Sequence, residues 1–388
     1  MKLALIGVGQ AGGKVVDALV EYDRLTQTGF VVDALAVNTA RSDLMGLRHV
    51  PKSSRVLIGL SRVKGHGVGA DNDLGAEVTA EDVGDVLSAI DDMAVHEMDA
   101  FLIVAGLGGG TGSGGAPVLA HELRRLYDEP IYGLGILPSK DEGGIYTLNA
   151  ARSLQTFVRV VDNLILFDNE AWRQSGESVE SGYETINTEL ARRFGVLFGA
   201  GETDESAAVA ESVVDSSEII NTLASGGVST LGYASVELDQ PKRGFLSRLA
   251  GSNVEEDEGD AENRLTSLVR RAALGRLTLP CDIAGTERGL VVFAGPPDVL
   301  SRRGIERGRA WLEDETGTME IRGGDYPVES KYVAAVVLLS GVYNVPRVKE
   351  LQAVAIEAQR DMLAKREGSS SALDELVDSD SDSLDSLF

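Results

Sequence analysis

The sequence predicts an α/β fold with an N-terminal parallel-sheet domain, a long central helix and a C-terminal α+β domain. Three observations support this fold class. Short apolar segments alternate with helical patterns through residues 1–140, two glycine-rich turns directly follow such segments, and one long amphipathic segment comes later. Apolar strands that alternate with helices are typical of a parallel sheet covered on both faces. The expected boundaries are 1–179 for the first domain, 180–200 for the helix, 201–366 for the second domain and 367–388 for an acidic tail.

Five apolar strands are expected in the N-terminal domain, at Leu3–Ile6, Ala34–Val37, Arg55–Ile58, Phe101–Ala105 and Ile131–Ile136. Helical patterns at Lys14–Tyr22 and Pro117–Tyr127 follow the first and fourth of these strands. Ligands of open parallel sheets bind beyond the carboxyl ends of the strands. A binding site is therefore expected along that edge of the sheet, where the chain leaves each strand.

The central helix is expected at Glu180–Phe198, after a further strand at Leu164–Phe167. Its apolar residues recur three or four positions apart and form one stripe: Tyr183, Ile186, Leu190, Phe194 and Leu197. The second domain is expected to contain a helix at Val214–Ala224, a strand at Thr230–Leu238, a helix at Asn263–Leu274, strands at Gly289–Ala294 and Tyr332–Leu339 joined by a helix, and a last helix at Val345–Arg366.

Two polar segments are expected to lie outside the core. Pro241–Glu262 is predicted to be an exposed loop, because its acidic run cannot be buried, and the Ser- and Asp-rich segment Gly368–Phe388 is predicted to be disordered. We interpret the apolar N-terminal segment as a strand and not as a signal peptide. No apolar run approaches the ~20 residues of a transmembrane helix.

Composition excludes several classes of function. The net charge is −25, from 61 acidic and 36 basic residues, which disfavours a nucleic-acid partner because phosphate contacts need clustered Lys and Arg. The basic cluster Arg302, Arg303, Arg307 and Arg309 is interpreted as a solvated helix face. A single cysteine, Cys281, rules out an intrachain disulfide and a Cys-based metal cluster, and the four histidines show no metal-binding spacing. So acidic and lysine-poor a surface suits a salt-rich cytoplasm and predicts a halophilic source.

The first glycine loop, Gly7–Gly12, fits G-x-G-x-x-G between a strand and a helix. By itself this pattern predicts only that a phosphate can approach the backbone and the helix N-terminus. A Rossmann-like dinucleotide site also needs an acidic residue at the end of the second strand. Here that strand ends in Asn38-Thr39, and Asp33 precedes it. An NAD(P)-binding oxidoreductase therefore remains the alternative and not the first hypothesis.

The second glycine loop, Ala105–Pro117, reads AGLGGGTGSGGAP. So many glycines would be entropically unfavourable in a mere linker. Between a strand and a helix they let successive N–H groups form an anion-binding concavity. The loop lacks the G-x-x-x-x-G-K-[ST] pattern of P-loop proteins. Two such loops in one sheet predict a nucleotide held from two sides.

At these residues the chain resembles the tubulin/FtsZ superfamily, whose signature is GGGTG(S/T)G. The resemblance covers Met1 to about Arg366. It includes a series of loops in the family's order: Gly9–Gly12, Asn38-Thr39, His66–Asn72, Asp141–Gly144, Phe167–Ala171 and Tyr183–Asn187. Ala40 stands where FtsZ commonly has Asp. The resemblance implies a Rossmann-like GTPase domain, a central helix and the C-terminal domain of the tubulin/FtsZ fold.

The same resemblance implies that the chain binds GTP or GDP together with Mg²⁺. The implied nucleotide-binding residues are Gly9, Gln10, Ala11, Gly12, Gly13, Lys14, Asn38, Gly69, Ala70, Asp71, Asn72, Gly106, Gly108, Gly109, Gly110, Thr111, Gly112, Glu142, Asn169, Tyr183 and Asn187. Glu142 is implied to hold the ribose, and Gln10 and Asp71 to reach the metal through water. For Asn169 and Asn187 the chemistry agrees, since an amide offers both a donor and an acceptor to the guanine edge. The Tyr183 ring can stack on the base or be ordinary core.

Val213–Glu218 resembles the superfamily's synergy loop, with Asp215 and Glu218 at its two carboxylate positions. Spacing alone predicts a helix N-cap with a capping box, and both interpretations can hold together. In the family this loop lies on the face opposite the nucleotide and meets the γ-phosphate bound to the next subunit. The resemblance therefore implies a head-to-tail homopolymer and a GTPase activated by self-assembly, with Asp215 and Glu218 as the catalytic residues.

Within the superfamily the chain is most similar to the haloarchaeal CetZ branch. This implies cytoskeletal filaments that help to control cell shape. The filaments are expected in the cytoplasm, at the inner face of the cell envelope. The tail from Ala372 onward is predicted to dock a membrane-associated partner or a division or shape protein, or only to confer solubility. A third possibility is a filament protein that binds GTP without hydrolysing it.

Overall fold

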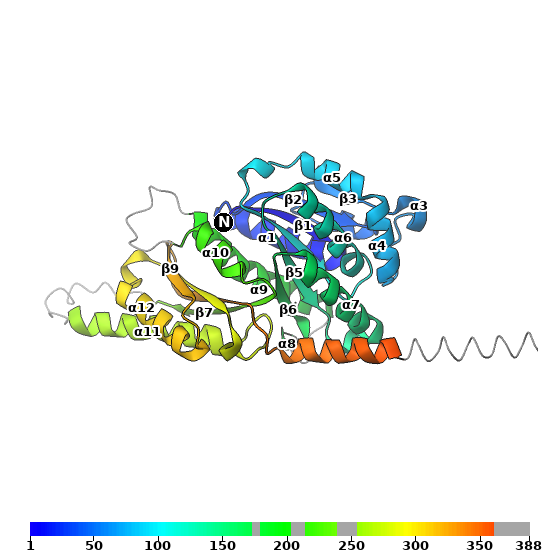
Figure 1. Cartoon of the computed structure of the whole chain (residues 1–388). Helices are drawn as coiled ribbons and strands as arrows, with labels where there is room; N and C mark the ends of the chain where they lie inside the picture. The colour runs from blue at the N-terminus through cyan, green and yellow to red at the C-terminus, as the bar shows by residue number, and fades with distance from the viewer. Residues whose placement is uncertain (173–178, 203–213, 239–253, 361–388) are drawn as a thin grey trace, which may run out of the picture.

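In the computed structural model, residues 1–172, 179–202, 214–238 and 254–360 are described. Within these ranges ten strands form one continuous sheet in the order β3-β2-β1-β4-β5-β6-β7-β10-β8-β9 (Figure 1). The strands are β1 Leu3–Val8, β2 Val31–Asn38, β3 Arg55–Leu57, β4 Ala100–Gly106, β5 Ile131–Leu137, β6 Asn163–Asp168, β7 Val228–Glu237, β8 Arg288–Gly295, β9 Ile321–Pro327 and β10 Tyr332–Ser340. The N-terminal strands pair in parallel, whereas β10 pairs antiparallel with β7 and β8. The predicted α/β fold is confirmed.

Helices cover both faces of this sheet. They are α1 Gly9–Thr26, α2 Arg41–Met45, α3 Leu60–Val63, α4 Asn72–Glu81, α5 Val83–Asp91, α6 Thr111–Leu126, α7 Gly144–Val160, α8 Asn169–Trp172, α9 Val179–Gly199, α10 Ser216–Leu223, α11 Val254–Leu274, α12 Arg302–Thr316 and a last helix at 346–360. The two clusters of the core use alternate residues of β1: Ile6 belongs to the cluster that includes residues of α5, α6 and α7, and Leu5 to the cluster that includes residues of α1, α9 and α10. Strands buried on both faces explain the unbroken apolar segments of the sequence.

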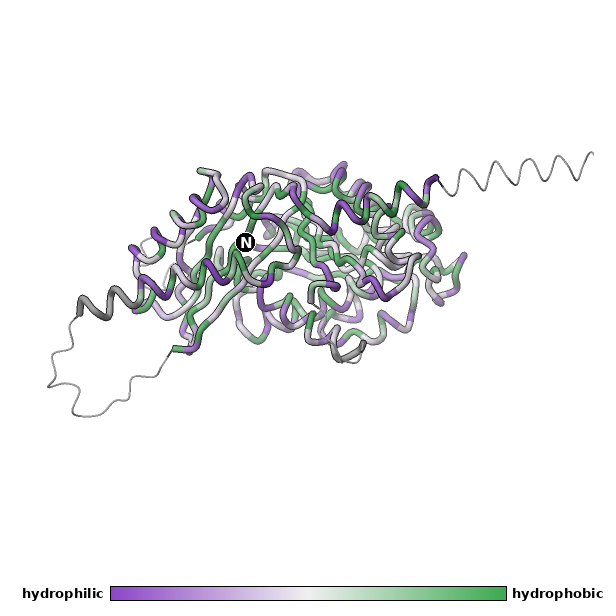
Figure 2. Tube along the Cα trace, turned by 90° about the horizontal axis from the view of Figure 1, so that it is seen from below, coloured by the Kyte–Doolittle hydropathy of each residue, from purple (hydrophilic) through white to green (hydrophobic). Residues whose placement is uncertain are grey.

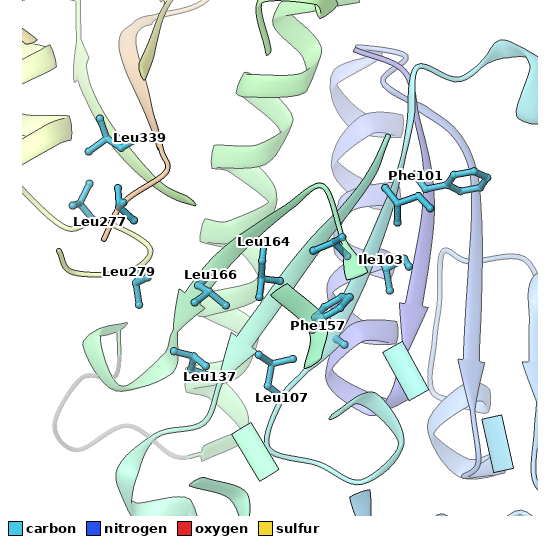
Figure 3. Packing of buried hydrophobic residues seen from close by; sticks show 14 of the residues in the cluster. Phe101, Ile103, Leu107, Leu137, Phe157, Leu164, Leu166, Leu277, Leu279 and Leu339 are labelled. Atoms are coloured by element: carbon cyan, nitrogen blue, oxygen red, sulfur yellow. The ribbon is translucent and has the colours of Figure 1, made fainter. Parts of the chain in front are cut away.

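The core continues from the first domain into the second. Figure 3 shows one cluster that extends from Phe101 and Ile103 on β4, through Leu164 on β6, to Leu339 on β10. Figure 2 shows the hydrophobic residues along the middle of the molecule and hydrophilic ones on the outer helices. One shared core therefore fixes how the second domain packs on the first.

A buried polar cluster joins the two domains where β6 meets β7. Only Leu164 and Ile165 of β6 pair with β7. Beside them the Asn163 amide donates to Leu223 O at 2.9 Å and to Ser340 Oγ at 2.9 Å, and Ser229 Oγ donates to Asn163 Oδ1 at 2.6 Å. Satisfied polar groups in a dry junction specify one arrangement of the elements they join. The exact boundaries between the domains stay a prediction.

The structure differs from the expected elements at several places. Helix α6 begins at Thr111 and not at Pro117, and α4, α5, α7 and β9 were not predicted. Pro117 lies inside α6 and cannot donate to Ser113 O, which instead accepts from Ser153 Oγ at 2.8 Å.

The prediction that the acidic run up to Glu262 is an exposed loop was wrong for its last part. Helix α11 begins at Val254, and Glu262 is buried, because its carboxylate is paired at 2.8 Å with Arg307 on α12. The basic cluster on α12 is solvated as expected, with the Arg302 side chain 72% exposed. Residues 239–253, Val213 and the tail lie outside the described residues. Among the helices described, none is long and apolar enough to cross a membrane.

Candidate functional site

A cavity of about 460 Å³ lies beyond the carboxyl ends of the parallel strands. The loops after β1, β2, β4, β5 and β6 contribute to its wall, as expected for this class of sheet. Seventeen of the residues implied by the resemblance line it: Gly9, Gln10, Ala11, Lys14, Asn38, Gly69, Ala70, Gly106, Gly108, Gly109, Gly110, Thr111, Gly112, Glu142, Asn169, Tyr183 and Asn187. Folding thus brings together seven separate segments of the chain around one space.

Two helix N-termini face this cavity. Helix α1 follows Val8 and α6 follows Gly110, and in the part of the chain that the structure describes no side chain caps either start. Neither first turn contains an acidic residue. The first N–H groups of a helix have no partner within the helix, and the helix dipole favours an anion beside them. The pair of uncapped N-termini is suited to bind phosphate groups.

Close backbone contacts explain several of the glycines. A Cβ on Gly9, whose φ is 75°, would lie 2.9 Å from Gly112 N, and a Cβ on Gly110 would lie 2.4 Å from Val68 Cγ2. In contrast, a Cβ on Gly69 or Gly109 would meet no described atom within 4 Å. The first two glycines therefore let the loops approach one another, and the last two leave space that a ligand can use.

Asn149 on α7 ties two of these loops together. Its buried amide donates to Ala70 O at 2.8 Å and to Gly108 O at 3.0 Å. Thr39 Oγ1 and Thr111 Oγ1, 2.7 Å apart, form a second buried link between loops. Asn149 could not be identified from the sequence, because no motif marks a residue that binds only the backbone of distant loops.

Replacing Asn149 by Ala should destabilise the protein by about 1–3 kcal/mol, because two carbonyls lose their donor and that of Gly108 is buried. We expect a lower melting temperature in thermal unfolding followed by circular dichroism. The matched control is Thr156→Ala, which removes an exposed polar side chain from the same helix. Equal melting temperatures of the two variants would contradict the role of Asn149.

At the other end of the cavity, Asn169 presents an unpaired acceptor. Its side chain is 6% exposed, and its Oδ1 has no hydrogen-bond partner among the described residues. A buried acceptor without a donor is unfavourable unless a ligand supplies one. Tyr183 lies nearby and its hydroxyl donates to Glu142 Oε1 at 2.9 Å, while Asn187 contributes a second amide to the wall. These groups match the N–H donors and the flat face of a purine base.

Four implied residues lie outside the lining. A Cβ on Gly12 would lie 2.1 Å from Val104 O, so this glycine allows α1 to pack on β4, and Gly13 faces Leu47. Asp71 is the N-cap of α4, and its carboxylate accepts from Leu74 N at 2.9 Å. Asn72 begins α4 and bonds Ser113. Their nucleotide-binding roles, and the metal role of Asp71, stay predictions.

The lining also contains residues that the sequence analysis did not select: Ser42, Asp43, Ile136, Pro138 and Tyr146. Asp43 Oδ2 accepts from the Asn38 amide at 3.1 Å. Within the described ranges no three His, Cys, Asp or Glu side chains form a metal-binding group. Mg²⁺ bound through phosphates and one or two protein oxygens needs no such group, and Gln10 and Asp43 of the lining offer side-chain oxygens of that kind.

Asp215 and Glu218 do not contribute to the described lining of this cavity. Asp215 is the N-cap of α10 and accepts from Glu218 N at 3.0 Å, so the predicted cap is present. The start of α10 lies at the amino end of β1, because Met1 N and Ser216 N both approach Gly201 (Figure 1). The cavity lies at the carboxyl end of β1, roughly 20 Å away for a six-residue strand. The two carboxylates therefore lie at the opposite end of the strands from the cavity of their own subunit.

The environment gives these carboxylates different acidities. A hydrogen bond from Ser217 holds the pKa of Asp215 below its usual value, so this group is ionised at neutral pH. Burial raises the pKa of Glu218, and the charge of Asp215 raises it further, whereas Arg322 opposes the shift. A carboxylate with a raised pKa is the better acceptor of a proton from water.

Comparison with known proteins agrees with this geometry. Residues 2–177 match the Tubulin/FtsZ family, GTPase domain, and residues 176–357 match the Tubulin-like CetZ, C-terminal domain. Tubulin-like protein CetZ3 of Haloferax volcanii is 76% identical over 389 residues and 100% of each chain. The structure of CetZ1 from Haloferax volcanii, a GDP-bound monomer, is 64% identical and covers 92% of this chain and 100% of that one, with a TM-score of 0.84. The structure of CetZ2 from Haloferax volcanii, a GTPγS-bound protofilament, is 49% identical and covers 93% and 99%, with a TM-score of 0.82. This chain therefore belongs to the tubulin/FtsZ family and, within it, to the CetZ branch, as its loops predicted.

Proposed function

We propose that this protein binds GTP in the cavity, assembles head to tail into cytoskeletal filaments and hydrolyses GTP where two subunits meet. The single observation that carries the proposal is that the cavity and the two carboxylates lie far apart in one subunit. The cavity, with the uncapped helix ends and the unpaired Asn169 oxygen, lies at the carboxyl end of β1, and Asp215 and Glu218 lie at its amino end. A second copy stacked in the same orientation would bring its carboxylates to that cavity.

In this mechanism the chain's own residues bind the nucleotide and orient the attacking water. The N-termini of α1 and α6 hold the phosphates, and Asn169 accepts a hydrogen bond from the guanine edge. Glu218 of the adjoining subunit accepts the proton of the attacking water, and the ionised Asp215 helps to orient that water. Mg²⁺ would be held by Gln10 and Asp43, with Asp71 as the weaker candidate, and would neutralise charge on the phosphates.

Turnover per subunit should rise steeply with protein concentration, because a lone subunit lacks the acids of its neighbour. The measurement is phosphate release from GTP, followed together with light scattering in high salt. Binding of a fluorescent GTP analogue to dilute protein, measured by fluorescence polarisation, is the control and should show that a lone subunit already binds the nucleotide. A constant rate per subunit from strictly monomeric to crowded protein would contradict the shared site.

The cellular role is proposed from the family. The predicted halophilic source agrees with the relatives from Haloferax volcanii. We place the filaments in the cytoplasm at the inner face of the cell envelope, with a role in cell shape. The partner of the tail stays a prediction, since residues 361–388 are outside the described residues. Deletion of the tail should leave GTP binding unchanged.

A further inference from the structure

Arg347 is a buried arginine at the start of the last helix, in the second domain. Its side chain is 6% exposed. Nη2 donates to Pro138 O at 2.9 Å, Nη1 donates to Glu350 Oε2 at 3.0 Å, and Nε lies 3.6 Å from Asp168 Oδ1. One guanidinium group therefore contacts two residues of the first domain, which precede it by more than 170 positions.

Both of these residues adjoin the base end of the cavity. Pro138 follows β5 and lines the cavity itself. Asp168 is the last residue of β6, immediately before Asn169 and its unpaired oxygen. Arg347 thus joins the ends of two neighbouring strands at the place where the wall of the cavity begins.

A second set of contacts ties the same helix to the loop after β5. Lys140 Nζ pairs with Glu350 Oε1 at 2.9 Å, and Lys140 N donates to Glu170 Oε2 at 2.8 Å. This loop carries Glu142, which accepts the hydrogen bond from Tyr183. The contacts of the last helix therefore reach both sides of the base end, the loop with Glu142 and the turn with Asn169.

We propose that Arg347 is a positioning residue that sets the preference of the cavity for guanine. It does so because it fixes the position of the turn at Asn169 relative to the loop after β5. The inference rests on the proposed GTP-binding function. Arg347 does not line the cavity and is not a catalytic residue. It acts through the backbone of Pro138 and the carboxylate of Asp168.

An arginine suits this place better than a lysine. Its planar fork can donate to Pro138 O and Glu350 while it faces Asp168, whereas a lysine carries the charge on one compact group. Asp168 also depends on this charge. Burial raises the pKa of Asp168 to about 6, and the nearby Arg347 opposes that shift. Without Arg347 the carboxylate would be buried without its counter-ion, which destabilises the end of β6 directly before Asn169.

The test compares Arg347→Met with Lys349→Met, which removes a positive charge from the exposed side of the same helix. Dissociation constants for GTP and ATP are measured for each variant by competition with a fluorescent GDP. The dissociation constant for ATP divided by that for GTP measures the preference for guanine. This ratio should fall about tenfold in Arg347→Met, the equivalent of one buried hydrogen bond, and should stay at the wild-type value in Lys349→Met. An equal loss of affinity for both nucleotides, or an unchanged ratio, would overturn the inference.

If Arg347→Met does not fold, as judged by circular dichroism, the same measurement is made on Arg347→Lys, which keeps the positive charge and loses the planar guanidinium group. An intermediate ratio supports the positioning role, and the wild-type ratio overturns it. Failure of the wild-type protein to bind GTP would instead sink the proposed function. A selective wild type with an equally selective Arg347→Lys would sink only the inference about Arg347.

Discussion

Replacing Gly110 by Asp is expected to abolish nucleotide binding. A Cβ at this position would lie 2.4 Å from Val68 Cγ2 and 2.8 and 2.9 Å from the backbone O and N of Asp71. The loop would have to move, and overpacking of this kind costs about 1–3 kcal/mol. The aspartate would also place a negative charge at the start of α6, where the phosphates are expected. Isothermal titration with GTP measures the loss.

Two control variants separate the causes. Gly110→Ala keeps the clash without the charge, and because φ of Gly110 is −85° the alanine adds no backbone strain. Since GTP must then bind to a displaced loop, the clash should weaken GTP binding by about 5- to 150-fold. Gly84→Asp adds the same charge in α5, where a Cβ would meet no described atom within 4 Å, and should bind GTP normally. Wild-type affinity in Gly110→Asp would refute the phosphate site.

How far the fold could be predicted depended on how each element is buried. The strands β1 and β4 were predicted because both of their faces are core and their sequences are unbroken apolar runs. Strand β9, with the sequence IRGGDYP, was missed because two glycines and a proline give it low β-propensity, and pairing with β8 supplies the stability instead. Burial of Glu262 could not be predicted either, since it depends on Arg307 of another helix.

The candidate site shows the same limit. The glycine loops could be located from the sequence, but the separate reasons for their glycines could not. Gly114 would have a Cβ 2.2 Å from Asn72 O, so it serves the packing of α6 against α4, whereas Gly109 faces open space. Both belong to one run in the sequence. Asp43 and Tyr146 were missed because only the tertiary structure brings them to the cavity.

Glu218→Gln should stop turnover without weakening GTP binding. The amide is isosteric but cannot accept a proton from water, and removal of a positioned general base typically lowers rates by 10²–10⁴-fold. The side chain lies outside its own subunit's cavity, so the affinity of the monomer for GTP should equal that of the wild type. Phosphate release and fluorescence polarisation measure the two quantities. Asp298→Asn, the same change at an exposed acid elsewhere, is the control and should keep the wild-type rate.

A mixture of two inactive variants tests whether the site is shared. Glu218→Gln has an intact cavity and no catalytic base, whereas Asn169→Leu has an intact base and a cavity without its guanine acceptor. In mixed filaments, which co-sedimentation verifies, the cavity of the first variant meets Glu218 of the second. Turnover should then exceed the sum of the two separate rates. If co-sedimenting mixtures released no more phosphate than that sum, each subunit would have to supply its own base, and the carboxylates on α10 would be only a helix cap.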